Sequence, residues 1–419
     1  MLEEIKLLQL ERLQATLNRV YKEVPFYRRL FERISFNPEE VSDLEDLKKI
    51  PFTTKEHLRE NYPYNFFAVP LREVVRIQAT AGTTGIPIVV GYTKRDLQIL
   101  SEVSAKALQQ WNLSKDDVVQ ITFHPGLFSS AFGLQSGAEK LGASVIPVNF
   151  EDPYKQLKIL QDYRTTVLIC TPSYASWLTE ILPHSGINPN TLMLKKIILC
   201  GEPFTEEQRK RIEEAFKVKV YNLYSNMEIF GPGIAYECDN KRLHFQEEYF
   251  LVEVINPHTS EPVQAGEKGE LVITTLVKEA FPLIRFRTGD LVMLEGITCS
   301  CGNPYLCTSP ILGRRDEVII VRGLKISCDQ IEKILLDILG EKPLYQILLG
   351  KKKGLEEVLL LLVLSERFFT DSYLEQEQLK RKIEEKLLLE LSLPFEIKFV
   401  EKGSLQRKNG EIIKIIDKR

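Results

Sequence analysis

Several short segments of this chain carry residues whose types and spacing suit the binding of a nucleotide. The first, residues 80–87, reads Thr-Ala-Gly-Thr-Thr-Gly-Ile-Pro and lies between two expected strands. Its glycines, threonine hydroxyls and backbone N–H groups could wrap a polyphosphate, as other anion-binding loops do. A glycine-rich hairpin between two strands accounts for the same residues, so this segment alone does not establish a phosphate site.

Three further segments offer carboxylates and a guanidinium. Glu228, at the end of Tyr-Ser-Asn-Met-Glu, could hold Mg²⁺, which prefers oxygen ligands. Asp290, at the end of Phe-Arg-Thr-Gly-Asp, suits two ribose hydroxyls because a carboxylate accepts hydrogen bonds on both oxygens. Arg314, within Gly-Arg-Arg-Asp, presents a planar fork that fits phosphate or ribose oxygens. The structural alternatives are an exposed carboxylate, an ordinary Gly-Asp turn and a surface linker.

The cysteines and one histidine indicate a metal site. Cys238 and His244 share one short segment, and Cys299 and Cys301 form a second pair further along the chain. Three thiolates and one imidazole make a closed tetrahedral set for Zn²⁺, with Cys307 as a substitute ligand. The remaining cysteines are expected to be small buried apolar residues; these are Cys170, Cys200 and Cys328.

Alternating strand and helix patterns predict the scaffold that must position these residues. After a helix over 2–23, strands are expected at 74–79, 88–92, 118–123, 144–148, 166–170 and 196–200, with helices that include 95–110 and 206–216. This order predicts an α/β fold with a mostly parallel sheet covered on both faces. We expect a large domain over 1–315, with an attached β-subdomain at about 245–312.

The last part of the chain, 316–419, is expected to form a small α+β lid domain. Its pattern predicts strands at 318–321, 345–349, 358–364 and 396–400, and helices at 330–339 and 372–391.

Composition excludes several classes of protein. The chain has 419 residues, of which 44% are hydrophobic, and 55 basic residues nearly balance 58 acidic ones, for a net charge of -3. These values are typical of a soluble globular protein and give no reason to expect a nucleic-acid partner. The longest apolar run, 358–364, is far too short to cross a bilayer, and the N-terminus lacks the pattern of a signal peptide. We therefore expect a cytoplasmic protein without a membrane partner, and leave a homodimer open.

The motifs also occur in a characteristic order, and the chain resembles the phenylacetate-coenzyme A ligase family of adenylate-forming enzymes. The resemblance runs from Val-Pro-Phe-Tyr at 24–27 to Ile-Asp-Lys-Arg at 416–419. Its most specific parts are Gly-Thr-Thr-Gly (82–85) with Val-Val-Gly-Tyr-Thr (89–93), Cys-Thr-Pro-Ser-Tyr (170–174), Gly-Pro-Gly (231–233) and Arg-Phe-Arg-Thr-Gly-Asp (285–290). Relatives with cysteine and histidine at matching places also favour the zinc site.

The resemblance implies a two-step reaction. ATP first joins a small-molecule carboxylic acid to AMP with release of pyrophosphate, and coenzyme A then displaces AMP after the small domain rotates. It implies a phosphate loop from Thr80 through Gly82, Thr83, Thr84 and Gly85; Mg²⁺ on Glu228; Tyr224 over adenine; and an adenine wall of Gly201, Glu202 and Pro203. It further implies ribose binding by Asp290 and Arg314, a hinge at Asp316, a thiol tunnel beginning at Gly323, and an acyl pocket that includes Phe123, Phe128, Ser130 and Ala131.

The chain departs from the family at three places. Met227 stands where a serine is expected to hydrogen-bond the α-phosphate, and Ser130 with Ala131 replaces a glycine pair in the acyl pocket. Glu411 stands where the adenylating lysine is expected. We expect a single strand over 411–416, which would turn Lys414 away from the position of Glu411, so that Lys408 is the better substitute.

These observations leave two alternatives beside the ligase. One is an adenylating enzyme with an acceptor other than coenzyme A. The other is a catalytically weak protein that binds a nucleotide or an acyl adenylate and acts with partners. Glu411 and Met227 favour the weak protein, whereas Glu228, Asp290 and Arg314 favour an enzyme.

Overall fold

The computed structural model describes residues 2–80, 87–123, 130–148, 152–296, 299–314, 318–322, 324–341, 343–352, 355–365, 373–408, 411–412 and 414–419. These residues fall into two compact units, one within 2–314 and the other within 318–419.

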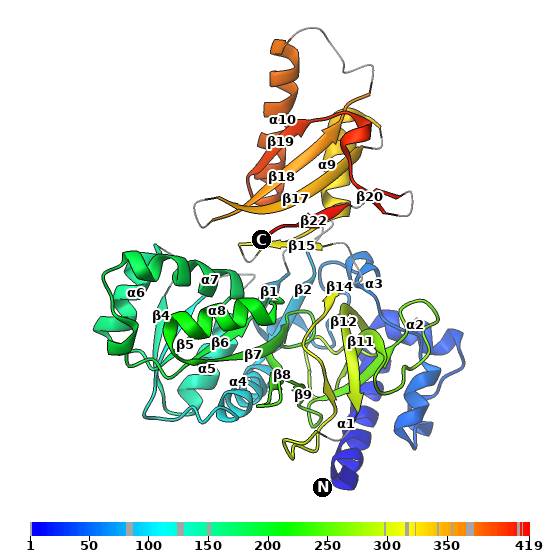
Figure 1. Ribbon diagram of the computed structural model, residues 1–419. Coiled ribbons are helices and arrows are strands. Elements are labelled where there is room, and N and C mark those ends of the chain that lie inside the picture. The colour runs from blue at the N-terminus through cyan, green and yellow to red at the C-terminus, as the bar shows by residue number, and fades with distance from the viewer. Residues whose placement is uncertain are drawn as a thin grey trace. The chain divides into compact units, whose positions relative to one another are not determined.

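A twelve-stranded mixed sheet forms the main body of the first unit (Figure 1). Its strands follow the order β10-β11-β12-β13-β9-β8-β7-β6-β5-β3-β4, with β14 paired to β12. Strands β3 to β7 run parallel to one another, which confirms the expectation of a parallel α/β sheet. Their bounds are Val118–Thr122 (β3), Ser144–Val148 (β4), Val167–Cys170 (β5), Lys196–Cys200 (β6) and Lys219–Asn226 (β7).

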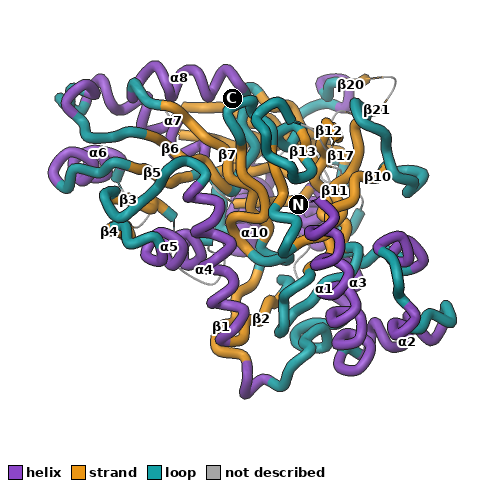
Figure 2. Tube along the Cα trace, turned by 90° about the horizontal axis from the view of Figure 1, so that it is seen from below, coloured by secondary structure: helices purple, strands orange, loops and turns teal. Residues whose placement is uncertain are grey.

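Helices cover both faces of this parallel half, which explains why its strands are apolar on both sides. Ile169 and Ile198 face a core shared with α4 and α5, whereas Leu168 and Leu199 face a core shared with α6, α7 and α8. Figure 2 shows α4 and α5 on one side of these strands and α7 and α8 on the other. The helices span Lys94–Gln109 (α4), Ala131–Lys140 (α5), Pro153–Asp162 (α6), Pro172–Ile181 (α7) and Glu206–Phe216 (α8).

The predicted β-subdomain is hydrogen-bonded to the parallel half, since its strands continue the same sheet beyond β7. Strand β8 pairs antiparallel with β7, and the remaining strands follow in antiparallel order. Their bounds are Gly231–Glu237 (β8), Leu243–Phe245 (β9), Phe250–Ile255 (β10), Lys268–Thr275 (β11), Phe286–Gly296 (β12), Cys307–Thr308 (β13) and Gly313–Arg314 (β14).

The first two predicted strands do not join this sheet. Strands β1 (Val74–Ala79) and β2 (Val89–Thr93) form a separate antiparallel pair, so their expected place in the parallel series was wrong. The physical reason is the short connection between them, because parallel neighbours need a crossover of a dozen or more residues. The glycine- and threonine-rich segment therefore joins two strands of one ribbon.

The N-terminus forms the predicted helix, α1 (Leu2–Glu23), whose buried Leu13 and Leu17 pack into the largest core of the first unit. Pro25 ends this helix and opens the next, α2 (Pro25–Arg33), because proline is tolerated in the first turn of a helix but not in its interior. A third helix, α3, spans Lys55–Glu60.

The second unit is the predicted small α+β domain. A four-stranded sheet in the order β19-β18-β17-β22 shares one core with helices α9 and α10, and β15 pairs with β16. The elements span Val318–Val321 (β15), Leu324–Ser327 (β16), Cys328–Leu339 (α9), Leu344–Lys352 (β17), Leu355–Val363 (β18), Tyr373–Leu391 (α10), Phe395–Phe399 (β19), Arg407–Lys408 (β20), Glu411–Ile412 (β21) and Ile415–Asp417 (β22).

The expected strand over 411–416 is wrong, because two different strands occupy this segment. The short β21 pairs with β20, whereas β22 pairs with β17 in the main sheet of the unit. Side chains alternate between faces only within one strand, so this rule does not predict where Lys414 points relative to Glu411. Lys414 instead forms an ion pair with Glu332 of α9, with its Nζ 5.8 Å from the centre of the Tyr345 ring.

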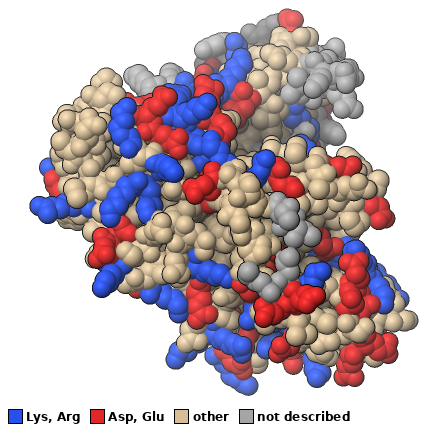
Figure 3. All heavy atoms as spheres, turned by 60° about the horizontal axis from the view of Figure 1, so that its bottom comes forward, with Lys and Arg blue, Asp and Glu red and all other residues tan. Residues whose placement is uncertain are grey.

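The described helices include none that is both long and apolar enough to span a membrane. On the face seen in Figure 3, Lys and Arg side chains are interspersed with Asp and Glu side chains, so this face presents no purely basic surface.

Candidate active site

The carboxyl ends of the parallel strands bring the predicted residues to one edge of the sheet. Phe123 follows β3, Gly201 follows β6, and Glu228 lies in the turn after β7. Ligands of open α/β sheets bind at this edge, since loops from neighbouring strands meet there.

Asp290, Tyr224 and Arg314, predicted from three separate motifs, meet in one buried cluster. The Tyr224 hydroxyl donates to Asp290 Oδ2 at 2.6 Å, and Arg314 forms an ion pair with Asp290 Oδ1. Strand pairing brings Asp290 opposite Arg314, and the Arg314 guanidinium also donates to the Thr288 carbonyl at 3.1 Å. Burial, with the adjacent Asp290 carboxylate, raises the pKa of Tyr224 well above its usual value. The carboxylate is therefore fixed in place and keeps lone pairs for hydroxyl donors.

Glu228 lies in the turn between β7 and β8 and is partly exposed. Asn226 shapes this turn by accepting the Ile229 N–H on its side chain at 3.3 Å and the Phe230 N–H on its backbone carbonyl at 3.1 Å. Among the described residues, no hydrogen bond or ion pair engages the Glu228 carboxylate. Its oxygens are therefore available to a cation, which fits the Mg²⁺ that the sequence predicts.

The segment Gly201-Glu202-Pro203 begins directly after β6. Gly201 has φ +91°, a conformation that residues with a Cβ rarely adopt. The Glu202 carboxylate accepts the Ser173 backbone N–H at 3.0 Å and the Ser173 hydroxyl at 2.9 Å, at the start of α7. The side chain of Glu202 therefore links two neighbouring loops. Because this side chain is engaged, the part of residues 201–203 left to line an adenine is their backbone.

Thr80 closes the β1–β2 ribbon where the predicted phosphate loop begins. Its backbone N–H donates to the Ile88 carbonyl at 2.9 Å, and its hydroxyl accepts the Ile88 N–H at 3.3 Å. The other predicted loop residues lie outside the described residues, as do the acyl-pocket residue Phe128, the hinge and the start of the thiol tunnel; they are Gly82, Thr83, Thr84, Gly85, Phe128, Asp316 and Gly323. The side chains of Lys408 and Glu411 also lie outside them.

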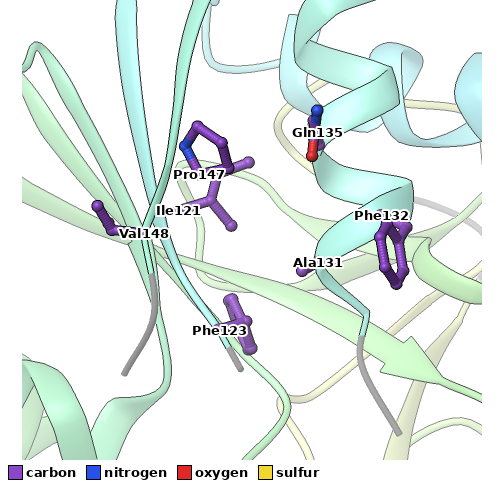
Figure 4. A pocket seen from close by; sticks show the side chains of 7 residues that line it. All are labelled: Ile121, Phe123, Ala131, Phe132, Gln135, Pro147 and Val148. Atoms are coloured by element: carbon purple, nitrogen blue, oxygen red, sulfur yellow. The ribbon is translucent and has the colours of Figure 1, made fainter. Parts of the chain in front are cut away.

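A small apolar hollow lies between β3, β4 and α5, with a cavity volume of ≈ 40 Å³ (Figure 4). It contains two of the predicted acyl-pocket residues, Phe123 and Ala131, together with Phe132 and Gln135 of α5. The other lining residues are Ile121, Pro147 and Val148. Ser130 is not among the lining residues of this hollow; it precedes α5 and faces the end of β7.

The four predicted zinc ligands come together from two distant segments. The ligand atoms of Cys238, His244, Cys299 and Cys301 all lie within 4.8 Å of one another. His244 Nε2 faces Cys301 Sγ at 3.3 Å, while its Nδ1 lies 3.1 Å from the Tyr305 carbonyl, a contact that orients the ring toward the thiols.

The chemistry of these donors also fits a cation. Burial raises the pKa of the Cys299 thiol, but hydrogen bonds from the Cys301 backbone and the Asn240 side chain outweigh it and bring this pKa down to about 6. Cys307, the substitute ligand, is buried and does not belong to this set of four. Its Sγ lies 3.5 Å from the Gly296 carbonyl oxygen.

Sequence patterns did not single out Lys278, whose ammonium group is buried beside the Glu228 turn. The residue is 1% exposed, and its Nζ lies 3.5 Å from the centre of the Tyr92 ring and 4.8 Å from that of Phe230. Among the described residues this Nζ has no hydrogen-bond acceptor. Burial lowers the pKa of Lys278 to about 7, against the opposing effect of Asp96. Nothing in the sequence around Lys278 indicates that its side chain is buried, because most lysines are exposed.

Replacing Lys278 by methionine is expected to stabilise the protein by roughly 2 to 4 kcal/mol at pH 7. The fall of its pKa from 10.5 to about 7 corresponds to about 5 kcal/mol, from which a cation–π attraction of about 2 kcal/mol is subtracted. Between these pH values the unfolded chain binds the proton more readily than the folded one, so the penalty grows as the pH falls from about 10 to 7.

Urea unfolding of both proteins at pH 7 and pH 9.5 measures this difference. The exposed Lys158 provides the matched control, because its replacement by methionine is expected to leave stability within about 0.5 kcal/mol. A Lys278→Met protein that is less stable than the wild type at pH 7 would contradict the interpretation.

Comparisons with known proteins identify the family to which the chain belongs. A model described as AMP-binding enzyme matches residues 29–276, and one described as AMP-binding enzyme C-terminal domain matches residues 323–419. The phenylacetate-coenzyme A ligase of Thermus thermophilus is 39% identical, covering 100% of this chain and 97% of the relative. That of Escherichia coli is 34% identical, covering 100% of this chain and 95% of the relative.

A solved structure of 2-hydroxyisobutyryl-CoA ligase, in complex with 2-HIB-AMP and CoA, is similar to this chain with a TM-score of 0.90 at 26% identity. The match covers 99% of this chain and 90% of that one. The chain therefore belongs to the phenylacetate-coenzyme A ligase family of adenylate-forming, AMP-binding enzymes.

Proposed function

We propose that this protein is an ATP-dependent ligase that activates an aromatic or otherwise apolar carboxylic acid and transfers it to coenzyme A. The observation that carries the proposal is the meeting of two kinds of site at one edge of the sheet. Residues suited to a nucleotide, Asp290, Arg314 and Glu228, lie in the same unit as an apolar hollow that suits the acid. The ligases named among its full-length relatives support the same activity.

In the first step a carboxylate oxygen of the acid attacks the α-phosphorus of ATP, and pyrophosphate leaves. Asp290 and Arg314 would hold the ribose, while Tyr224 and the backbone of Gly201-Glu202-Pro203 would flank adenine. Mg²⁺, which Glu228 would bind, neutralises charge on the phosphate oxygens. The segment from Thr80 to Gly85 would hold the phosphates, and Lys408 would supply the positive charge that the family takes from the position of Glu411.

In the second step the coenzyme A sulfur attacks the acyl carbon, and AMP leaves with the electrons of the broken bond. We propose that the C-terminal unit rotates about Asp316 between the steps, so that Gly323 lines the path of the thiol.

Pyrophosphate exchange tests this function. Purified protein is mixed with ATP, Mg²⁺, labelled pyrophosphate and one acid from a panel of aryl and aliphatic carboxylates. Exchange that depends on an aryl or other apolar acid, followed by thioester formation when coenzyme A is added, is the expected result. Exchange with no acid of the panel would reject the proposed activity.

Two departures favour a second candidate, a weakly catalytic protein that binds a nucleotide or an acyl adenylate. Met227 lacks the hydroxyl expected at its position, and Glu411 carries the charge opposite to that of the expected lysine. Under this alternative AMP binds in calorimetry although no acid supports exchange. An adenylating enzyme with another acceptor would instead exchange pyrophosphate but form no thioester with coenzyme A.

Replacing Asp290 by alanine is expected to weaken AMP binding by about tenfold to a hundredfold, because charge-assisted hydrogen bonds to the ribose are lost. Isothermal titration calorimetry measures the change. Glu253→Ala is a matched control, since it breaks the buried ion pair with Arg285 at 2.7 Å in the antiparallel half of the sheet. The control should lose stability but keep its AMP affinity, and equal affinities in all three proteins would refute the assignment of Asp290.

A further inference from the structure

Two residues at which this chain departs from its family, Ser130 and Met227, contact each other, and Ser130 also contacts Ser225. Ser130 precedes α5, and Ser225 and Met227 lie at the end of β7 and in the turn that follows it. The Ser130 hydroxyl lies 3.1 Å from the Ser225 hydroxyl and 3.3 Å from the Met227 sulfur. The start of α5 therefore meets the end of β7. We call Ser130 and Ser225 the hydroxyl pair, and the pair together with Met227 the cluster.

The backbone directs both hydroxyls toward this cluster. Ser130 occupies the N-cap position of α5, where serine usually accepts a helix N–H, but its side chain makes no such bond. The register of β7 and β8 shifts between Tyr224 and Ser225. Such irregularities re-aim side chains next to active sites. Tyr224 thus reaches Asp290 while its neighbour Ser225 reaches Ser130.

The hydrogen bonds of the cluster leave room for a stronger acceptor. The Ser130 hydroxyl donates its single proton to the thioether of Met227, which is a weak acceptor, so the Ser225 hydroxyl must donate to Ser130. A negatively charged oxygen makes shorter and stronger hydrogen bonds than a thioether does. A ligand that places such an oxygen beside the pair would therefore take over the proton of Ser130.

The cluster also lies where such an oxygen is expected. Met227 directly precedes Glu228, the proposed Mg²⁺ ligand, and Ser130 directly precedes Ala131, which lines the apolar hollow. An acid whose apolar part fills the hollow and whose carboxyl group meets the nucleotide near Glu228 would have its acyl-phosphate group between the two.

We propose that the Ser130–Ser225 hydroxyl pair donates a hydrogen bond to an oxygen of the acyl-phosphate group that joins the acid to AMP. This proposal rests on the proposed ligase function. The proton that reaches the ligand is that of Ser130, so the pair supplies the hydroxyl donor that the Met227 side chain lacks. Ser130 is thus a binding residue for the adenylate intermediate, and Ser225 is a positioning residue that orients the Ser130 hydroxyl.

The test measures binding of a non-hydrolysable mimic, 5′-O-(N-phenylacetylsulfamoyl)adenosine, by calorimetry, with adenosine as the reference ligand. Ser130→Ala is expected to weaken the mimic by about tenfold to a hundredfold, because the hydroxyl that would donate to the anionic acylsulfamate group is lost. Adenosine affinity should not change, since adenosine lacks the group that the pair contacts. Ser136→Ala is the matched control, because that hydroxyl only donates to helix carbonyls at 2.9 and 3.2 Å.

A relocated hydroxyl separates binding from packing. The double variant Ser130→Ala with Met227→Ser returns a hydroxyl to the turn, and we expect it to recover mimic affinity to within about threefold of the wild type. A purely structural role of Ser130 predicts no recovery, because serine is smaller than the methionine it replaces. Unchanged mimic affinity in Ser130→Ala, or a loss that the double variant does not recover, would overturn the proposal.

These measurements also distinguish the hydroxyl-pair proposal from the ligase function. A wild-type protein that exchanges pyrophosphate, with Ser130→Ala indistinguishable from it in mimic binding, rejects the hydroxyl pair alone. A wild-type protein that shows no exchange and binds the mimic no more tightly than adenosine rejects the ligase function.

Discussion

Replacing Glu411 by lysine is expected to raise the rate of pyrophosphate exchange by about a thousandfold. A unit charge about 4 Å from a phosphate oxygen is worth roughly 4 kcal/mol at an effective dielectric constant near 20. Each ~1.4 kcal/mol of transition-state stabilisation is worth about tenfold in rate. On the proposed alignment, a lysine at position 411 would supply this attraction, whereas the native glutamate would repel the phosphate.

The structure narrows the choice of a substitute amine in the native chain. Lys414 is engaged within its own unit, where it forms an ion pair with Glu332 and lies near the Tyr345 ring. Lys408 belongs to β20, whose backbone pairs with β21 so that Lys408 lies opposite Glu411 in register. We therefore keep Lys408 as the proposed substitute, and Lys408→Ala is expected to slow the residual exchange further.

Comparison of four proteins isolates the charge effect: the wild type, Glu411→Lys, Glu411→Gln and Lys408→Ala. Glu411→Gln removes the repulsion without adding attraction, so its rate should lie between those of the wild type and Glu411→Lys. Transfer from supplied acyl adenylate to coenzyme A serves as the control and should stay similar in all four. Brisk exchange by the wild type that Lys408→Ala leaves untouched would refute both the impairment and the rescue by Lys408.

The second large effect is expected at the cysteine and histidine cluster, which we propose holds one Zn²⁺ per chain. Cys299→Ser should abolish stoichiometric zinc and lower stability by several kcal/mol, because metal binding contributes directly to folding free energy. The ligands join β8 and β9 to the segment before β13, so their loss loosens the middle of the sheet. Nucleotide affinity should change less than stability, since Asp290 and Arg314 do not belong to the cluster.

Metal analysis after chelator washing, together with thermal unfolding, measures both effects. Cys307→Ser is the control, because Cys307 is buried nearby but stands outside the four-ligand set. It should retain zinc, whereas Cys299→Ser should not. Absence of stoichiometric zinc from wild-type protein made with ample metal would remove the site.

Many elements followed from local patterns in the sequence. The apolar strands β4 and β6 and the helix α8 lie where their periodicity predicts, because side-chain spacing and capping act within a few residues. The same local information failed for β1 and β2, where strand pattern does not specify which strand is the partner. It also failed over 411–416, where one apparent strand is shared between two sheets.

The sequence by itself determined which residues could do chemistry: the carboxylates Glu228 and Asp290, the Arg314 fork and the four metal-type ligands. Tertiary structure alone decided that Ser130 touches Met227 and that Lys278 is buried against Tyr92. These contacts join segments far apart in the chain, and their formation depends on how the whole sheet packs. Propensity and periodicity describe only neighbouring residues, so they carry no information about such meetings.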